Sequence, residues 1–148
     1  MSGTAPLRVT REAAPADEVV RAISDGLDAY NAQVLRDHDV APKPRHFVGW
    51  DETGAVRSGV RFWIALEWAI VEWLWVAEAH RGGGEGTRLL QSVEAEAREN
   101  GCRGVYLDTF SFQAPKFYAK LGYSEFGRIH DIPAGYDRIW LMKRFAGA

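Results

Sequence analysis

The sequence predicts an α/β fold, in one domain of residues 1–148 with a mixed β-sheet. The chain has 148 residues, 47% of them hydrophobic, which is enough for one domain with a substantial core and too few for two ordinary ones. Segments rich in β-branched and aromatic residues predict strands, and segments with apolar residues three and four positions apart predict helices. Strands alternate with helices only in the second half of the chain, which predicts that the sheet is mixed.

The N-terminal part of the chain predicts a short strand and a helical region. Residues 7–10 alternate apolar and polar side chains, as a first strand would. From Ala16 to about His38 the apolar residues recur at helical spacing; they are Val19, Val20, Ile23, Leu27, Tyr30, Val34 and Leu35. Gly26 is a weak point in this region, so one interrupted helix and two short helices both stay open.

A hairpin is predicted after the helical region, which Pro42 and Pro44 end. Residues 46–50 form its first strand, and residues 56–66 form its second. The turn between them is Asp51-Glu52-Thr53-Gly54, whose residues favour a tight reversal of the chain.

A central strand, a glycine-rich loop and a helix follow. Residues 67–76 are rich in β-branched and aromatic residues and predict the strand, with a hinge at Leu66-Glu67 between antiparallel strands. The helix has one apolar face, formed by Leu89, Leu90, Val93 and Ala97. Glu94 and Arg98 predict an ion pair on its outer face, and Gly101 predicts its end.

The last third of the chain predicts two strands around a short helix, and a hairpin. Residues 104–109 and 139–145 have strand patterns. Residues 115–121 predict a short helix, and Gly122 ends it. Residues 126–137 predict a strand, a turn and a return to the final strand; a simple hairpin and a turn that closes over a binding site both stay open.

Bulk properties exclude several classes of protein. The net charge is −2 and the pI is about 6.1, without a long basic block, so we expect no nucleic-acid partner. The most apolar stretch, residues 60–77, is interrupted by Arg61, Glu67 and Glu72, so we expect no membrane span. Cys102 is the only cysteine, which excludes an intrachain disulfide and fits a reducing compartment. The start of the chain lacks the pattern of a secretory signal, so we expect a cytoplasmic protein.

The glycine-rich loop Arg81-Gly82-Gly83-Gly84-Glu85-Gly86 is the strongest functional signal. It lies between a strand that ends at Val76 and a helix that begins near Gly86 or Thr87, so several backbone N–H groups meet at a helix N-terminus. Glycine lets a bulky phosphate approach these amides, and Arg81 adds a positive charge. The sequence therefore predicts an anion site.

The spacing of the glycines distinguishes between the phosphate-containing ligands that such a loop could bind. A P-loop needs Gly-Lys followed by Ser or Thr, but this loop continues as Gly86-Thr87-Arg88, which disfavours a nucleoside triphosphatase. A dinucleotide fingerprint that begins at Gly82 needs a third glycine at position 87, where threonine stands.

The loop resembles the motif of the GCN5-related N-acetyltransferase (GNAT) family, which has Arg or Gln, two residues, Gly, one residue, then Gly or Ala. Arg81, Gly84 and Gly86 match it. Other residues match the family in order and spacing: Leu74-Trp75-Val76, Ala114, Phe117-Tyr118 and Lys120-Leu121-Gly122-Tyr123. The resemblance covers about the second two thirds of the chain. It implies a mostly antiparallel mixed sheet flanked by helices, and acetyl-CoA as the cosubstrate without a metal.

The resemblance also implies which residues hold the cosubstrate. In the family, the strand before the loop splays from its neighbour and leaves backbone groups free for the pantetheine arm and the thioester carbonyl; here these belong to Leu74, Trp75 and Val76. The diphosphate would lie on the loop and helix start, formed by Arg81, Gly82, Gly83, Gly84, Glu85, Gly86 and Thr87. Ser111 stands where the family often has an asparagine that holds the cofactor arm, and Ser111 or Gln113 could substitute for it.

Two residues are candidates for catalysis. Tyr118 stands where the family usually has a tyrosine that protonates the sulfur of CoA. Glu72 is the candidate base, because on a regular strand it points to the same face as Leu74 and Val76. A solvated glutamate and a water chain as the base both stay open. Asp108 on the neighbouring strand is a candidate to orient the site.

The expected reaction is the attack of a primary amine, on a small molecule or a protein, on the thioester of acetyl-CoA. Two alternatives stay open: a CoA-binding regulatory domain without catalysis, and an anion-binding interaction module. Six tryptophans favour a core or a homodimer face over an aromatic substrate box; they are Trp50, Trp63, Trp68, Trp73, Trp75 and Trp140.

Overall fold

The structure is a computed structural model that describes residues 3–36, 38 and 42–148. The chain divides into two compact units, residues 1–37 and 38–148. The single domain inferred from the chain length stays a prediction. Met1, Ser2 and Asp37, which belong to the expected chain start and helical region, lie outside the described residues.

The first unit contains one helix, α1 (Asp17–Leu35). Two acidic residues occupy its first turn, where the helix dipole favours negative charge. Gly26 lies inside the helix without breaking it, because one glycine costs only about 1 kcal/mol in a helix interior. Residues 7–10 are not a strand, contrary to the prediction, since the described part of this unit offers no second strand to pair with them.

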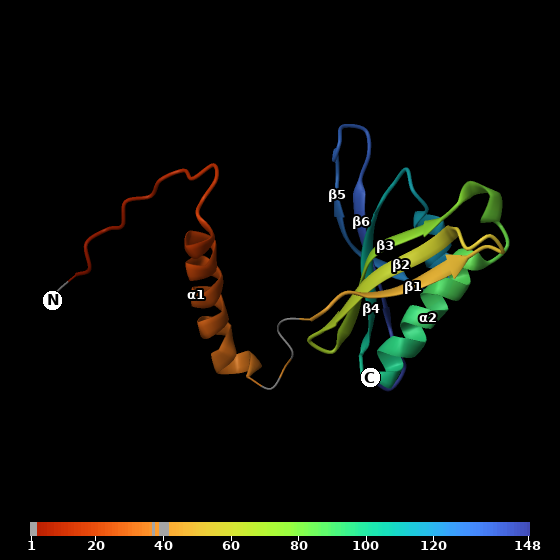
Figure 1. Ribbon diagram of the computed structural model, residues 1–148, viewed down its shortest axis with the longest axis horizontal. Coiled ribbons are helices and arrows are strands. Elements are labelled where there is room, and N and C mark those ends of the chain that lie inside the picture. The colour runs from red at the N-terminus through yellow and green to blue at the C-terminus, as the bar shows by residue number, and fades with distance from the viewer. Residues whose placement is uncertain (1–2, 37, 39–41) are drawn as a thin grey trace. The chain divides into compact units, whose positions relative to one another are not determined.

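The second unit is built on a six-stranded sheet in the order β1-β2-β3-β4-β6-β5 (Figure 1). The strands are β1 (Arg45–Trp50), β2 (Val56–Ala65), β3 (Trp68–Val76), β4 (Gly104–Phe110), β5 (Ser124–Ile129) and β6 (Arg138–Arg144). Only β3 and β4 pair in parallel, and the other pairs are antiparallel. The predicted mixed, mostly antiparallel sheet is therefore confirmed.

Two tight turns join the first three strands. In the β1–β2 turn, Asp51 Oδ1 accepts hydrogen bonds from the backbone N–H groups of Thr53 and Ala55, at 2.8 and 3.0 Å. The β2–β3 turn consists of Leu66 and Glu67, both with positive φ (49° and 64°). Positive φ at both central residues suits the right-handed twist of a hairpin, so the expected hinge is a two-residue turn.

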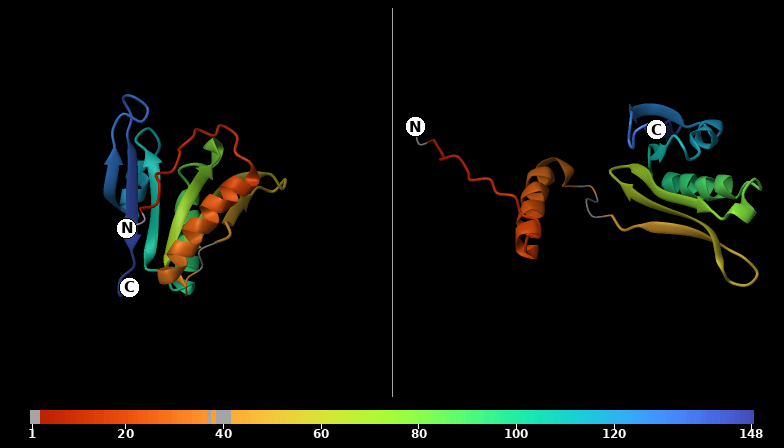
Figure 2. Two further views of the ribbon diagram at one scale, coloured as in Figure 1. Left: turned by 90° about the vertical axis from the view of Figure 1, so that its left-hand side faces the viewer. Right: turned by 90° about the horizontal axis from the view of Figure 1, so that it is seen from above.

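Helix α2 (Glu85–Glu99) covers one face of the sheet (Figure 2). Its apolar residues are buried as the spacing predicts: Leu89, Leu90, Val93 and Ala97. The short helix α3 (Pro115–Lys120) adds Tyr118 to the same core. Proline at its start has no N–H to leave unbonded, and Gly122 after its end has a φ of 91°. Among the described residues, no helix is both long and apolar enough to cross a bilayer.

Glu94 is buried, contrary to the predicted position on the outer face of α2. It is 5% exposed, and its Oε1 accepts a hydrogen bond of 3.1 Å from the hydroxyl of Tyr123. Lys143 Nζ lies 3.0 Å from Glu94 Oε2, and the predicted ion pair with Arg98 is confirmed, at 3.7 Å. A buried carboxylate is tolerated when it is paired in this way. Burial, together with the charge of Glu94, raises the pKa of Tyr123.

Candidate functional site

The parallel pair of β3 and β4 separates after three residue pairs. Residues 69–71 of β3 pair with residues 105–107 of β4, and no further pairs join the two strands. On its other side, β3 stays paired with β2 as far as Val76. Backbone groups of residues 72–76 that face β4 are therefore left without a strand partner, as the family resemblance implies for Leu74, Trp75 and Val76.

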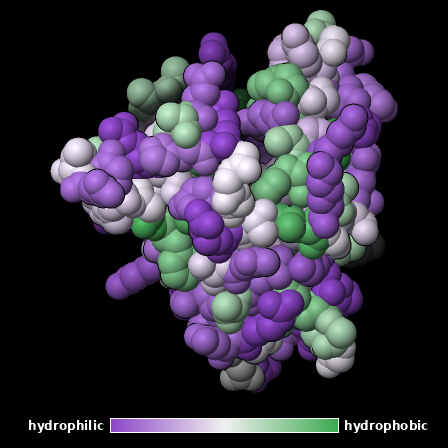
Figure 3. All heavy atoms as spheres, turned by 90° about the vertical axis from the view of Figure 1, so that its right-hand side faces the viewer, coloured by the Kyte–Doolittle hydropathy of each residue, from purple (hydrophilic) through white to green (hydrophobic). Residues whose placement is uncertain are grey.

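A cavity of about 790 Å³ lies where the two strands separate. Leu74 and Val76 line it from β3, Leu107 and Asp108 from β4, and Tyr118 from α3. The loop between β3 and α2 lines it as well. Figure 3 shows the side of the molecule on which this loop lies: hydrophilic residues form most of it, and apolar residues show between them. The lining of the cavity thus combines apolar side chains of the strands with the glycine-rich loop.

The glycine-rich loop offers unbonded backbone N–H groups at the mouth of the cavity. Gly84 caps the N-terminus of α2 with a φ of 83°, and Gly82 has a φ of 79°. None of the described residues accepts a hydrogen bond from the N–H groups of residues 82–87. The first amide of this region with a backbone partner is that of Arg88, which donates to Gly84 O at 3.0 Å. Free amides at a helix N-terminus bind anions.

Arg81 stands beside these amides and is attached to the strand that precedes them. Its Nε donates a hydrogen bond of 3.0 Å to the carbonyl oxygen of Val76. This contact holds the guanidinium at the mouth of the cavity, but it also occupies the Val76 carbonyl. Of the expected loop residues, all but Gly83 line the cavity.

Tyr118 projects into the cavity from α3 and is 8% exposed. Its ring contacts those of Phe117 and Tyr123, with centroids 5.1 and 6.1 Å away. Burial, and secondarily the charge of Asp108, raises the pKa of Tyr118 to about 12. The phenol therefore keeps its proton at neutral pH, as a proton donor must.

Glu72 lines the cavity, but the prediction that it shares a face of a regular strand with Leu74 and Val76 is wrong. The β2–β3 ladder pairs Val71 with Phe62 and Trp73 with Arg61, so Glu72 is an extra residue in a β-bulge. A bulge interrupts the alternation of faces, and parity with Leu74 and Val76 does not hold across it. Glu72 Oε2 instead lies 2.7 Å from Arg61 Nε and accepts a hydrogen bond of 3.0 Å from Trp63.

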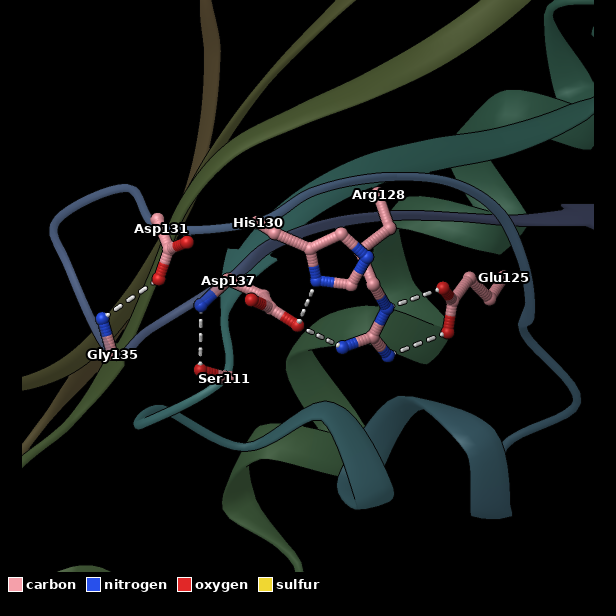
Figure 4. A network of polar contacts seen from close by, with 7 residues as sticks. All are labelled: Ser111, Glu125, Arg128, His130, Asp131, Gly135 and Asp137. Carbon is pink, nitrogen blue, oxygen red and sulfur yellow. Dashed lines mark hydrogen bonds and ion pairs between the residues drawn. The ribbon is translucent and has the colours of Figure 1, made fainter.

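Ser111 is not brought to the cavity. Its hydroxyl accepts a hydrogen bond of 2.9 Å from the N–H of Asp137, in the loop between β5 and β6 (Figure 4). Asp137 also binds Arg128 at 2.6 Å, and Arg128 pairs with Glu125 on the same hairpin. The role of Ser111 thus lies in joining the β4–α3 turn to the β5–β6 loop, which does not support a contact with the cofactor arm.

Gln113, the other expected substitute, does line the cavity. Its side-chain oxygen accepts hydrogen bonds from Thr109 Oγ1 at 2.9 Å and from the N–H of Phe110 at 2.8 Å. These contacts close the turn after β4. Phe112, which the sequence did not single out, lines the cavity beside it.

Ser58 was also not anticipated as part of the site. It is 1% exposed on β2, and its hydroxyl donates a hydrogen bond of 2.7 Å to Glu85 in the glycine-rich loop. The sequence does indicate that Ser58 is buried. It lies at every second position with Val60 and Phe62, which are core residues, so its side chain points to the same face of β2. A buried hydroxyl needs a hydrogen-bond partner, which points to a contact outside its own strand.

Comparison with known proteins identifies proteins that are similar to this chain in sequence and in structure. A family model described as "Acetyltransferase (GNAT) family" matches residues 11–123. The acetyltransferase Atu2258 of Agrobacterium fabrum is 34% identical over 86% of this chain and 92% of its own length. Blasticidin-S acetyltransferase of Streptomyces morookaense is 40% identical over 62% of this chain and 68% of its own. A crystal structure of an acetyltransferase from Bacillus cereus, 33% identical, superimposes with a TM-score of 0.82 over 92% of this chain and 98% of that chain.

Proposed function

We propose that this chain, which belongs to the GNAT family of acetyltransferases, transfers the acetyl group of acetyl-CoA to a primary amine. In this reaction the amine attacks the thioester directly. Family membership makes the chain an acetyl-CoA-dependent N-acetyltransferase. We further propose that the attack is direct, and we propose which residues assist it and which kind of amine accepts the acetyl group.

One observation carries this proposal: unbonded amides of residues 82–87 meet the open edge of β3 at one cavity. A CoA diphosphate on those amides would direct its pantetheine arm along residues 74–76, where a peptide-like arm can bond to free backbone groups as a strand does. The thioester would then lie towards Tyr118, which lines the cavity from α3. This arrangement favours acetyl transfer over a general anion-binding role.

The chemistry requires two proton transfers. As the neutral amine attacks the thioester carbon, its nitrogen forms the new C–N bond and loses a proton, and the C–S bond breaks. Tyr118 donates its phenolic proton to the departing sulfur and regains one from solvent. A backbone N–H on the open edge of β3 would stabilise the oxyanion that develops on the carbonyl oxygen.

We assign the removal of the amine proton to Glu72, directly or through a water molecule. Glu72 lines the cavity and is 38% exposed at its side chain, so it is accessible to an amine despite its pair with Arg61. Changing Glu72 to Gln is expected to lower kcat about a hundredfold or more, since a general base contributes about 10²–10⁴. Unchanged kcat over a pH series, with a folded variant, would assign Glu72 to a structural pair with Arg61 alone.

The function is tested by measuring release of free CoA thiol from acetyl-CoA with a panel of amines. We include blasticidin S because one relative is named for it, and we add polyamines and peptides with a free N-terminus or lysine. The expected result is amine-dependent thiol release together with a new N-acetyl product in mass spectrometry. Thiol release is the discriminating readout, because the non-catalytic alternative also binds CoA.

Calorimetric titration with acetyl-CoA, CoA and ATP separates the alternatives. Binding of CoA without thiol release for any amine would favour a CoA-binding regulatory domain. Equal binding of ATP and CoA would favour an anion-binding module, because that module needs only the diphosphate contacts.

A further inference from the structure

Glu85 brings a negative charge into the anion site. It is the first residue of α2, and its own N–H is among the unbonded amides of the loop. A carboxylate in the first turn of a helix is attracted to the helix N-terminus. Placed on those amides, it would compete with a bound diphosphate and repel it. The position of the Glu85 side chain therefore decides whether the site is open.

The structure shows that the Glu85 carboxylate is held elsewhere. Its Oε1 accepts a hydrogen bond of 2.7 Å from Ser58, a residue of β2 that is 1% exposed. Its Oε2 pairs with Arg88 one turn later in α2, at 2.5 Å from Nη2. Both contacts hold the pKa of the Glu85 carboxyl below its ordinary value, so the group is ionised at neutral pH.

Gly49 provides the space for this contact. It lies opposite Ser58 in the β1–β2 ladder. A Cβ atom at position 49 would lie 2.1 Å from Ser58 Oγ and 2.8 Å from Glu85 Oε1, which is closer than real contacts. The glycine is thus needed for close approach. Strands β1 and β2 together enclose one oxygen of the carboxylate.

The direction of this contact follows from the order of the strands. The cavity opens between β3 and β4, while β1 and β2 lie on the other side of β3. Glu85 lines the cavity, but Ser58 draws its carboxylate towards β2, on the side of β3 that is away from the open edge. Gly86, the next residue of α2, lies on the cavity side, where a Cβ would be 3.2 Å from Phe117.

We propose that Gly49 and Ser58 hold the Glu85 carboxylate away from the loop amides, and that Ser58 is thereby a positioning residue for the diphosphate of acetyl-CoA. This inference rests on the proposed function, since it concerns the same cosubstrate site. Ser58 touches neither the acetyl group nor the amine. Its loss acts on the affinity for CoA and leaves the chemical step in place.

The test compares Ser58→Ala with Ser92→Ala by calorimetry with CoA. Ser92 lies on the exposed side of α2, where its hydroxyl donates to the Arg88 carbonyl, so its loss controls for removal of a serine hydroxyl near the site. Ser58→Ala is expected to raise the Kd for CoA, and the KM for acetyl-CoA, about tenfold with kcat unchanged, the scale of one hydrogen bond to a charged group. Ser92→Ala is expected to change neither constant.

A second variant separates positioning from a loss of folding. Glu85→Gln removes the charge, so the double variant Ser58→Ala with Glu85→Gln is expected to recover the affinity of the unaltered protein for CoA. A merely structural defect at Ser58 would persist in the double variant, and that result overturns the inference, as does a Ser58→Ala variant that binds CoA normally. Absence of CoA binding by the unaltered protein would instead contradict the proposed function itself.

Discussion

Replacing Gly84 with valine is expected to weaken the binding of acetyl-CoA by about tenfold to a hundredfold. Gly84 caps α2 with a φ of 83°, and a non-glycine residue in this region costs about 1–3 kcal/mol. The loop would relieve that strain by moving to a conformation in which the amides of residues 82–87 no longer meet. Binding must then restore the strained conformation, so the strain energy appears as lost affinity in a calorimetric titration.

Gly54→Val is the matched control for this prediction. Gly54 has a φ of 79°, and no atom lies within 4 Å of a Cβ built on it, so the substitution brings similar strain. It lies in the β1–β2 turn and does not line the cavity. Both variants should lose thermal stability, but only Gly84→Val should lose acetyl-CoA affinity. Equal Kd values in the two variants would show that the loop amides do not hold the diphosphate.

Changing Tyr118 to Phe is expected to lower kcat about a hundredfold or more, since a general acid contributes about 10²–10⁴. The ring remains, so the packing against Phe117 and Tyr123 is kept. Acetyl-CoA affinity should change little, because only the departing sulfur loses a proton donor. Turnover at saturating substrate, measured beside the calorimetric Kd, separates the two effects.

A control variant, Tyr106→Phe, and the pH dependence of kcat test this role of Tyr118 further. Tyr106→Phe removes a phenol from the same part of the sheet, but Tyr106 does not line the cavity, so kcat should stay unchanged. The pKa of Tyr118 is raised to about 12, so its acid form persists well above the ordinary tyrosine value. A loss of kcat between pH 9 and 10 that depends on Tyr118 would contradict the raised pKa, and a Tyr118→Phe variant with unchanged kcat at saturating substrates would contradict the role as proton donor.

The sequence predicts most elements of the second unit because the residues at their ends have strong conformational preferences. Gly101 and Gly122 follow α2 and α3 with positive φ, and Pro115 begins α3. The glycine-rich loop was predictable for the same reason, because glycines at positions 82 and 84 adopt conformations that other residues resist. Such signals are local and can be read without knowledge of the sheet.

Features that depend on distant partners could not be predicted in this way. The burial of Glu94 depends on Tyr123 and Lys143, which come from other parts of the chain. The bulge at Glu72 depends on its pairing register with β2, which the residues of β3 alone do not encode. Residues 7–10 alternate in polarity, yet a strand also needs a neighbour with free backbone groups.

The early separation of β3 from β4 predicts that acetyl-CoA stabilises the folded chain. Three residue pairs join these strands, and a bound pantetheine arm would take the place of the missing part of the ladder. A ligand that binds only the folded chain stabilises it by about 2.7 kcal/mol at a concentration a hundred times its Kd. The melting temperature of the protein is therefore expected to rise when acetyl-CoA is added.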